Sequence, residues 1–247
     1  MMKKFEKPKL SSGNKAFDEW LNGGYEKDII NCIYGQFATG KTNFCLMALA
    51  ELLKQNKKAI YIDTESSFSL DRLKQIMGEN YSKEKLKNII MFRPTSFKEQ
   101  IDTFNKLIKI DLNKISAIFV DSIGMLYRLE LGLIRDEDKE IEKEEEKERI
   151  RKINLALARQ LRILNEIARK RKIAIIVTNQ VYQSIIDSQI HMVGGDILKY
   201  WSKCLIYLEH LGDKRKATLV KHRSLPQKEF VYKIVEKGIE KIRKFIF

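Results

Sequence analysis

Short apolar runs alternate with amphipathic segments along most of the chain. Between the runs, residues 42–53 and 97–110 repeat apolar side chains at the spacing of a helix. Runs this short that are apolar throughout are typical of strands buried on both faces of a parallel sheet. The alternation therefore predicts βαβ units with helices on both faces of the sheet. The strand-like runs are residues 29–34, 59–62, 88–93, 117–120 and 173–177.

A polar lead-in, residues 1–28, precedes the first apolar run. Within it, Phe17, Trp20 and Leu21 stand at i, i+3 and i+4, which predicts one short amphipathic helix. No internal repeat and no Gly/Ser-rich linker divides the sequence after the lead-in. We therefore expect residues 1–247 to form a single domain.

The pattern changes beyond residue 195, where strand-like segments follow one another with short connectors. The first connector, Leu211-Gly212-Asp213, has the composition of a hairpin turn. We expect antiparallel strands here that extend one edge of the parallel sheet. These segments are residues 203–211, 214–222 and 229–236.

The segment 136–149 is strongly acidic, with nine acidic and four basic residues and a net charge of −5. The net charge of the whole chain is +14, so the residues outside this segment carry a net charge of +19. Glu/Lys pairs at i,i+4 in this segment suit a solvated helix extension. A disordered charged loop fits the same composition equally well.

The basic net charge favours polyanionic partners, either nucleic acid or an anionic surface, although Lys-rich chains are also simply soluble. Two short basic runs, 169–172 and 214–216, fit polyanion contact or an ordinary solvated surface. The three cysteines have no paired spacing, so we expect neither a disulfide framework nor a zinc site. No apolar segment approaches the ~20 residues of a membrane span, and the charged N-terminal residues are not followed by the apolar stretch of a secretion signal. We expect a cytoplasmic protein without a membrane partner.

The most specific motif begins directly after the first apolar run. Residues 35–42, GQFATGKT, match G-x-x-x-x-G-K-[ST] between a predicted strand and a predicted helix, as a phosphate-binding loop requires. Lys41 would reach the β- and γ-phosphates of a nucleotide, and the Thr42 hydroxyl would bind Mg²⁺. The alternative is a chance Gly/Lys turn. We expect ATP to contact Gly35, Gln36, Phe37, Ala38, Thr39, Gly40, Lys41, Thr42 and Asn43.

Three polar residues follow other predicted strands, at the sheet edge where ligands bind in open α/β folds. Asp121 ends the run 117–120 and is placed to hold the shell of a Mg²⁺ ion. Glu65 follows the second strand and could activate a water molecule. Gln180 follows the last parallel strand and could contact a γ-phosphate. The ordinary alternatives are a strand-end cap, a helix-start glutamate and a polar turn residue.

In this order and spacing, the motifs resemble the RecA-superfamily recombinases, and most closely their archaeal single-domain RadB-type paralogues. The resemblance covers nearly the whole chain, from about residue 9 to residue 240. It implies a RecA-like P-loop NTPase core: a mostly parallel central sheet, helices on both faces and antiparallel C-terminal strands. It also implies an ATPase core that lacks the extra N-terminal helical domain of strand-exchange recombinases. The matching segments are SSGNKAFDEWLNGG, GQFATGKTNF, YIDTESSFSLDRL, AIFVDSIGMLYR, IIVTNQV, GGDILKYWSKCLIYLE and KHRSLP.

The resemblance implies a catalytic set within one chain. Glu65 matches the water-activating glutamate, and Gln180 matches the γ-phosphate sensor, acting with Lys41. Asp121 matches the second acid of the phosphate site, which holds Mg²⁺ with Thr42, partly through water.

Further residues are implied to contact the adenine or a neighbouring subunit. Arg72 matches an arginine that stacks on adenine, although an exposed helix arginine is the simpler explanation. Lys221 and Arg223 match a Lys-x-Arg pair that reaches a neighbour's γ-phosphate, and their i, i+2 spacing suits one face of a strand. A basic edge strand that discourages aggregation explains the same pair.

The resemblance implies an ATP-binding accessory protein of DNA repair and homologous recombination. It would bind DNA, hydrolyse ATP weakly and regulate a recombinase or branched-DNA processing, with a main recombinase, a Holliday junction resolvase or further copies as partners. Residues 181–195 match the second DNA-contacting loop of the recombinases, called the second loop below. This loop lacks Lys and Arg, and its Gly194-Gly195 pair suggests mobility, so we do not expect DNA to thread through a filament axis. The alternatives are a KaiC-like signalling ATPase without DNA and a pseudo-enzyme. The basic net charge favours the first function.

Overall fold

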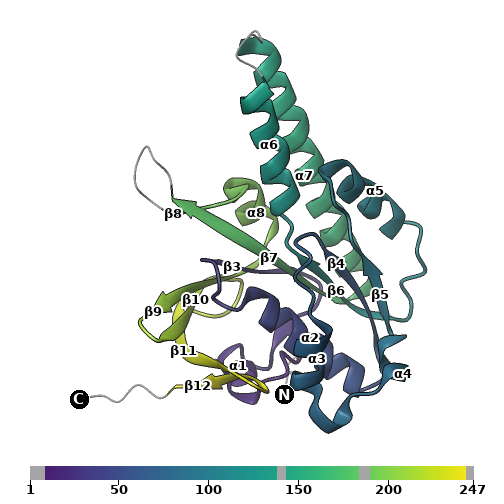
Figure 1. The fold of residues 1–247 in the computed structure, drawn as a ribbon, viewed down its shortest axis with the longest axis vertical. Helices are drawn as coiled ribbons and strands as arrows, with labels where there is room; N and C mark the ends of the chain where they lie inside the picture. Colours follow the sequence, from purple (N-terminus) through teal and green to yellow (C-terminus); the bar gives the residue numbers. More distant parts are fainter. Residues whose placement is uncertain (1–8, 138–142, 184–189, 243–247) are drawn as a thin grey trace, which may run out of the picture.

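The computed structural model describes residues 9–137, 143–183 and 190–242. Parts of the lead-in, of the acidic segment and of the second loop therefore lie outside the described residues. Figure 1 shows the described structure as a central sheet with helices on both faces and one projecting pair of helices.

The central sheet has a parallel core, as the apolar runs predict. Within the described residues it has ten strands, nine of them in the order β12-β11-β10-β9-β3-β7-β6-β4-β5, with β8 paired to β7. Neighbouring strands from β9 to β5 run parallel. The five strands that the apolar runs predicted are β3 (Ile30–Gly35), β4 (Lys58–Asp63), β5 (Ile89–Phe92), β6 (Ile115–Asp121) and β7 (Ala174–Gln183).

The C-terminal strands extend the sheet beyond β3 in antiparallel order, which confirms the prediction. The turn at Gly212, whose φ is 58°, joins β9 to β10. The sequence pattern missed the fourth of these strands and the short β8. The strands are β9 (Cys204–Leu211), β10 (Lys214–His222), β11 (Lys228–Val235), β12 (Gly238–Lys241) and β8 (Ile190–Met192).

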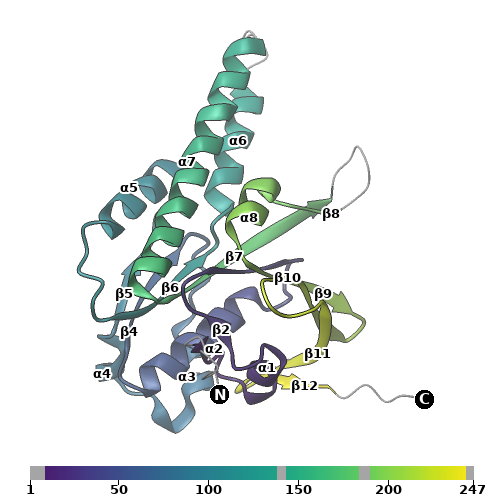
Figure 2. The same cartoon turned by 180° about the vertical axis from the view of Figure 1, so that it is seen from behind.

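Two apolar cores lie on opposite faces of the sheet, because neighbouring residues of a strand point to opposite sides. In β4, Tyr61 joins one core while Ile60 and Ile62 join the other. Figures 1 and 2 show the two helix layers from opposite sides. One layer contains α1 (Lys15–Trp20), α2 (Lys41–Lys54) and α3 (Leu70–Met77), and the other contains α5 (Phe97–Leu107), α7 (Lys143–Arg171) and α8 (Gly195–Trp201). The short α4 (Lys83–Leu86) and a 3₁₀ turn (Gly78–Asn80) follow α3.

The lead-in helix forms where its spacing predicts it. The Asn14 side chain accepts a hydrogen bond from the Phe17 amide and so caps α1. Phe17 is fully buried and packs its ring against Trp20, Phe44 and Phe230. A small two-stranded sheet, β1 (Lys9–Leu10) with β2 (Tyr25–Glu26), holds the two ends of this segment together. The lead-in is therefore an integral part of the core on this face.

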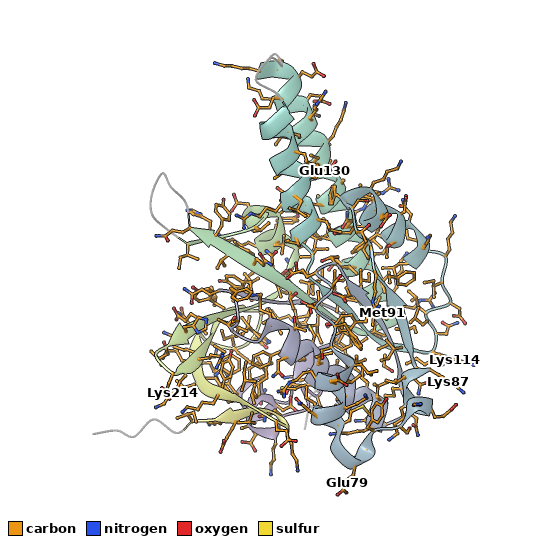
Figure 3. The ribbon with its side chains drawn as sticks, in the orientation of Figure 1. Glu79, Lys87, Met91, Lys114, Glu130 and Lys214 are labelled. Carbon is orange, nitrogen blue, oxygen red and sulfur yellow. The ribbon has the colours of Figure 1, made fainter. Side chains whose placement is uncertain are left out.

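The helices α6 (Met125–Glu137) and α7 project from the body as an antiparallel pair, and Glu130, labelled in Figure 3, lies along α6. Residues 143–149 form the first two turns of α7, with exposed i,i+3 and i,i+4 ion pairs such as Arg149 to Glu145. This described part of the acidic segment is therefore helical. None of the helices in the described ranges is long and apolar enough to cross a membrane.

Two expectations about loops are wrong. Gln180 does not follow the last parallel strand, because β7 continues to Gln183 and pairs there with β8. Gly194 does not belong to a loose loop: it caps α8 with a φ of 61°, and a Cβ there would lie 2.9 Å from Cδ2 of Leu157. The tight packing of α8 against α7 explains the glycine.

The expected Lys221–Arg223 pair lies only partly in a strand. Lys221 belongs to β10, but Arg223 follows its last residue, and the strand register shifts between Leu219 and Lys221. The Arg223 guanidinium donates hydrogen bonds to the Glu26 carboxylate and, at 2.7 Å, to Oδ1 of Asp28. Glu26 is 4% exposed, so the arginine neutralises a buried carboxylate and ties β10 to the lead-in.

We predict that Arg223→Ala lowers the free energy of unfolding by about 3 kcal/mol, because it leaves the buried Glu26 carboxylate without its cation. Urea denaturation measures the loss. The control is Lys221→Ala, which removes an exposed lysine from the same strand end and should change stability by less than about 0.5 kcal/mol. Equal stability of the Arg223→Ala variant and the wild type would contradict the buried-pair assignment.

Candidate nucleotide-binding site

The phosphate-loop motif occupies the turn between β3 and α2. Gly35 ends β3 with a φ of 154°, and a Cβ there would lie 2.0 Å from the Leu208 carbonyl oxygen of the neighbouring strand. Gly40 is the N-cap of α2 with a φ of 99°, so no side chain accepts from the first amides of that helix. The helix N-terminus is thus left open toward an anion.

The loop forms one wall of a cavity of about 450 Å³. Two motif residues, Gln36 and Thr39, do not line this cavity. Thr39 is fully buried, and its hydroxyl donates to the Gln36 carbonyl at 2.8 Å. Phe37 is 90% exposed at the rim. The predicted site residues that line it are Gly35, Phe37, Ala38, Gly40, Lys41, Thr42, Asn43, Glu65, Arg72 and Gln180.

Lys41 begins α2 and folds over the loop. Its ammonium group donates to the carbonyl oxygens of Gly35 at 3.0 Å and Gln36 at 2.8 Å. Burial lowers the pKa of Lys41, and the carboxylates of Glu65 and Asp121 oppose that effect. The residue is therefore a partly desolvated cation beside the open helix N-terminus, which is the arrangement that a phosphate group needs.

Asp121 is buried behind the cavity and is held by three hydroxyl groups. Its Oδ2 accepts from Tyr61 at 2.9 Å and from Ser67 at 3.0 Å, and its Oδ1 accepts from Thr178. The Ser67 hydroxyl also accepts from the Thr42 hydroxyl at 3.4 Å. Ser67 therefore connects the predicted metal ligand Thr42 to the predicted second acid.

The oxygen ligands that Thr42 and Asp121 offer fit Mg²⁺ better than a metal ion that is held by side chains alone. Mg²⁺ binds oxygen ligands and usually keeps several waters, with one or two carboxylates and the phosphates of its substrate. Thr42 offers a hydroxyl group, and Asp121 offers a carboxylate that is linked to this hydroxyl through Ser67. In the described parts of the chain, no group of three or more His, Cys, Asp or Glu residues could hold a metal by itself.

Glu65 follows β4 and lines the same cavity as Lys41. Its Oε1 accepts a hydrogen bond from the Gln180 amide at 3.0 Å and another from the Ser122 hydroxyl. Ser122 itself is fixed by Thr64, whose hydroxyl donates to the Ser122 carbonyl at 2.7 Å. One carboxylate oxygen of Glu65 is thus oriented by two neighbours, which suits a base that must hold a water in one position.

The predicted adenine residue, Arg72, lines the same cavity but is bound to the C-terminal strands. Its guanidinium donates to the side-chain oxygen of Asn43 at 2.7 Å and to the Val235 carbonyl at 2.7 Å. Burial lowers the pKa of Arg72, against the opposing charge of Glu236. The guanidinium plane is therefore fixed at the cavity edge by the turn between β11 and β12, a segment that the sequence did not connect with this site.

The residues that hold Asp121 and Glu65 were missed by the sequence reasoning. Ser67, Ser122 and Thr178 are common polar residues in loops and strand ends, and no spacing rule distinguishes them. A weak signal exists for Ser67, because it stands four residues after Asp63, whose carboxylate accepts from the Ser67 amide at 3.0 Å. Lys221 and Arg223 do not line the cavity of their own chain.

Comparison with solved structures agrees with this architecture. The crystal structure of the RadB recombinase superposes with a TM-score of 0.72 and 32% sequence identity. The match covers 95% of this chain and 100% of that structure. The predicted RecA-like fold, with its mostly parallel sheet and antiparallel C-terminal strands, is thereby confirmed.

Comparison with known sequences gives the same family. The RadB DNA repair and recombination protein of Methanococcoides burtonii is 40% identical over 222 residues, which cover 90% of this chain and 92% of the relative. Its counterpart in Methanocaldococcus jannaschii is 38% identical, covering 90% of this chain and 97% of the relative. A family model described as Rad51 matches residues 3–242. The chain therefore belongs to the Rad51 family and, within it, to the RadB group of DNA repair and recombination proteins.

Proposed function

We propose that this protein is an ATP-binding accessory factor of homologous recombination that binds DNA and hydrolyses ATP weakly. It would regulate a main recombinase or branched-DNA processing, for example through a Holliday junction resolvase, instead of catalysing strand exchange itself. The observation that carries the proposal is the convergence of Lys41, Thr42, Glu65 and Gln180 on one cavity beside the buried Asp121. The RadB relatives favour this function over a KaiC-like signalling ATPase.

In this proposal each residue has a separate task. The ammonium group of Lys41 and the loop amides bind the phosphates, and Thr42 with Asp121 holds the metal shell. Mg²⁺, when bound, supplies charge that neutralises the phosphate oxygens. Glu65 holds a water molecule and accepts its proton, while Gln180 keeps the carboxylate in place. That Lys221 and Arg223 act on the phosphate of a neighbouring subunit remains a prediction. A single subunit would lack these residues at its own site, so we expect it to turn over ATP slowly.

We predict that Lys41→Ala weakens ATP binding by about 100-fold or more, because the cation stands against the charge of the phosphates in a partly desolvated site. Calorimetric titration with Mg·ATP measures the affinity. Lys54→Ala at the other end of α2 is the control and should bind ATP like the wild type. Unchanged affinity in the Lys41→Ala variant would reject the site.

We predict that Glu65→Gln keeps ATP affinity within about twofold but lowers turnover by ~10²–10⁴-fold, since the amide preserves the shape and removes the base. Phosphate release measures turnover, with and without DNA at matched salt. The control is Glu79→Gln, which changes an exposed carboxylate of the 3₁₀ turn after α3, labelled in Figure 3, that is not among the residues lining the cavity. A Glu65→Gln variant that hydrolyses ATP at the wild-type rate would leave Glu65 with a purely structural role.

We predict that DNA binding is electrostatic and independent of sequence, because the chain carries a net charge of +14. The logarithm of the affinity for DNA should fall linearly with the logarithm of salt concentration, because counterions are released from the phosphates. Fluorescence anisotropy with two unrelated oligonucleotides, single- and double-stranded, measures both properties. A slope near zero, or a preference of more than tenfold for one sequence, would contradict the prediction.

A further inference from the structure

Three side chains of the C-terminal strands form a single row across the sheet. His210 in β9 is the register partner of Arg215 in β10, and Arg215 is the register partner of Tyr232 in β11. Residues directly opposite one another on neighbouring antiparallel strands project from the same face. Lys214, labelled in Figure 3, marks where β10 begins, next to this row.

The row binds three consecutive carbonyl groups of the phosphate loop. Nε2 of His210 lies 2.9 Å from the Phe37 oxygen, and Nε of Arg215 lies 3.1 Å from the Ala38 oxygen. The hydroxyl of Tyr232 lies 2.8 Å from the Thr39 oxygen.

Gln36, the loop residue before these three, is hydrogen-bonded to β9. The His210 amide donates to the side-chain oxygen of Gln36 at 3.1 Å, and the Gln36 amide donates to the Leu208 carbonyl at 3.2 Å. Every residue from 36 to 39 is therefore hydrogen-bonded to the C-terminal strands.

This arrangement determines where the loop amides point. In a trans peptide, the carbonyl oxygen and the following N–H group point in opposite directions. Carbonyls of residues 37, 38 and 39 that face the row therefore direct the N–H groups of Ala38, Thr39 and Gly40 away from it. Consecutive amides that point to one side form the concave anion site typical of phosphate loops.

From this geometry we infer that His210, Arg215 and Tyr232 are positioning residues for phosphate binding. They act through the loop backbone, without touching the phosphates, by holding its peptide groups in the orientation that an anion needs before the anion arrives. Preorganised donors bind more tightly because no ordering cost remains at the moment of binding. The inference rests on the proposed function, since it deepens the role of the same cavity.

The test compares Arg215→Ala and Tyr232→Phe with the wild type in calorimetric titrations against Mg·ATP and against inorganic tripolyphosphate. Each variant removes one hydrogen bond to a loop carbonyl and should weaken binding of both ligands by about fivefold, with a larger effect in the double variant. Arg215→Lys keeps a donor at the position and should recover most of the affinity. Titrations are run well below the thermal unfolding midpoint of each variant.

Two controls separate positioning from a general loss of stability. Lys233→Ala removes a surface ion pair with Asp213 from β11. Phe230→Leu weakens the core on the same strand without touching the loop. Phe230→Leu should lower the unfolding midpoint at least as much as the row variants, and Lys233→Ala should lower it little. Both should bind the ligands like the wild type.

The outcomes are distinct. Weaker ligand binding in the row variants alone supports the inference. Wild-type affinity in the row variants, or equal weakening in the controls, overturns it. A wild-type protein that binds tripolyphosphate but not ATP would reject the proposed nucleotide function and still test the row with tripolyphosphate. A protein that binds neither ligand would overturn both.

Discussion

The hydrogen-bond register of four neighbouring parallel strands, β3, β7, β6 and β4, places the polar residues of the site at one edge of the sheet. Gly35 is the register partner of Gln180, and Asp63 is the register partner of Asp121. A shift by one residue would turn each side chain to the opposite face of the sheet. Both faces are buried in apolar cores, so the register is strongly determined.

Within the described residues, the buried carboxylate of Asp121 is hydrogen-bonded to hydroxyl groups instead of forming an ion pair. Asp121 is 2% exposed, yet its hydrogen-bond partners are the neutral hydroxyls of Tyr61, Ser67 and Thr178. Hydroxyl donors satisfy a carboxylate without cancelling its charge, so the carboxylate keeps its attraction for a cation in the cavity. The buried Glu26 shows the opposite solution, because Arg223 neutralises it and the pair serves the fold.

The C-terminal strands contact the candidate nucleotide cavity from two sides. The β11–β12 turn holds Arg72 through the Val235 carbonyl, and the row on β9, β10 and β11 holds the phosphate loop. A segment that extends the sheet edge thereby also determines the shape of the binding site. Changes in the packing of these strands would be transmitted directly to the loop backbone.

The sequence alone predicted the alternation of parallel strands with helices, the phosphate-loop motif and the candidate residues Lys41, Thr42, Glu65 and Asp121, because each follows from a local pattern of period, turn and strand end. It missed the short strands β8 and β12. The tertiary structure decided which residues hold them. Tyr61 and Ser67 come from β4 and the loop after it, Thr178 comes from β7, and they meet Asp121 only where the sheet folds together.

The incorrect expectations also arose where contacts between distant segments decided the structure. Local composition suggested a mobile Gly194-Gly195 loop, but close packing against Leu157 requires the glycine at the start of α8. Spacing placed Arg223 on a strand, but the ion pair with the distant Glu26 and a shift in strand register decided its position. Local patterns specify elements because they depend on neighbours in sequence, whereas side-chain partners depend on contacts between residues as far apart as 197 positions.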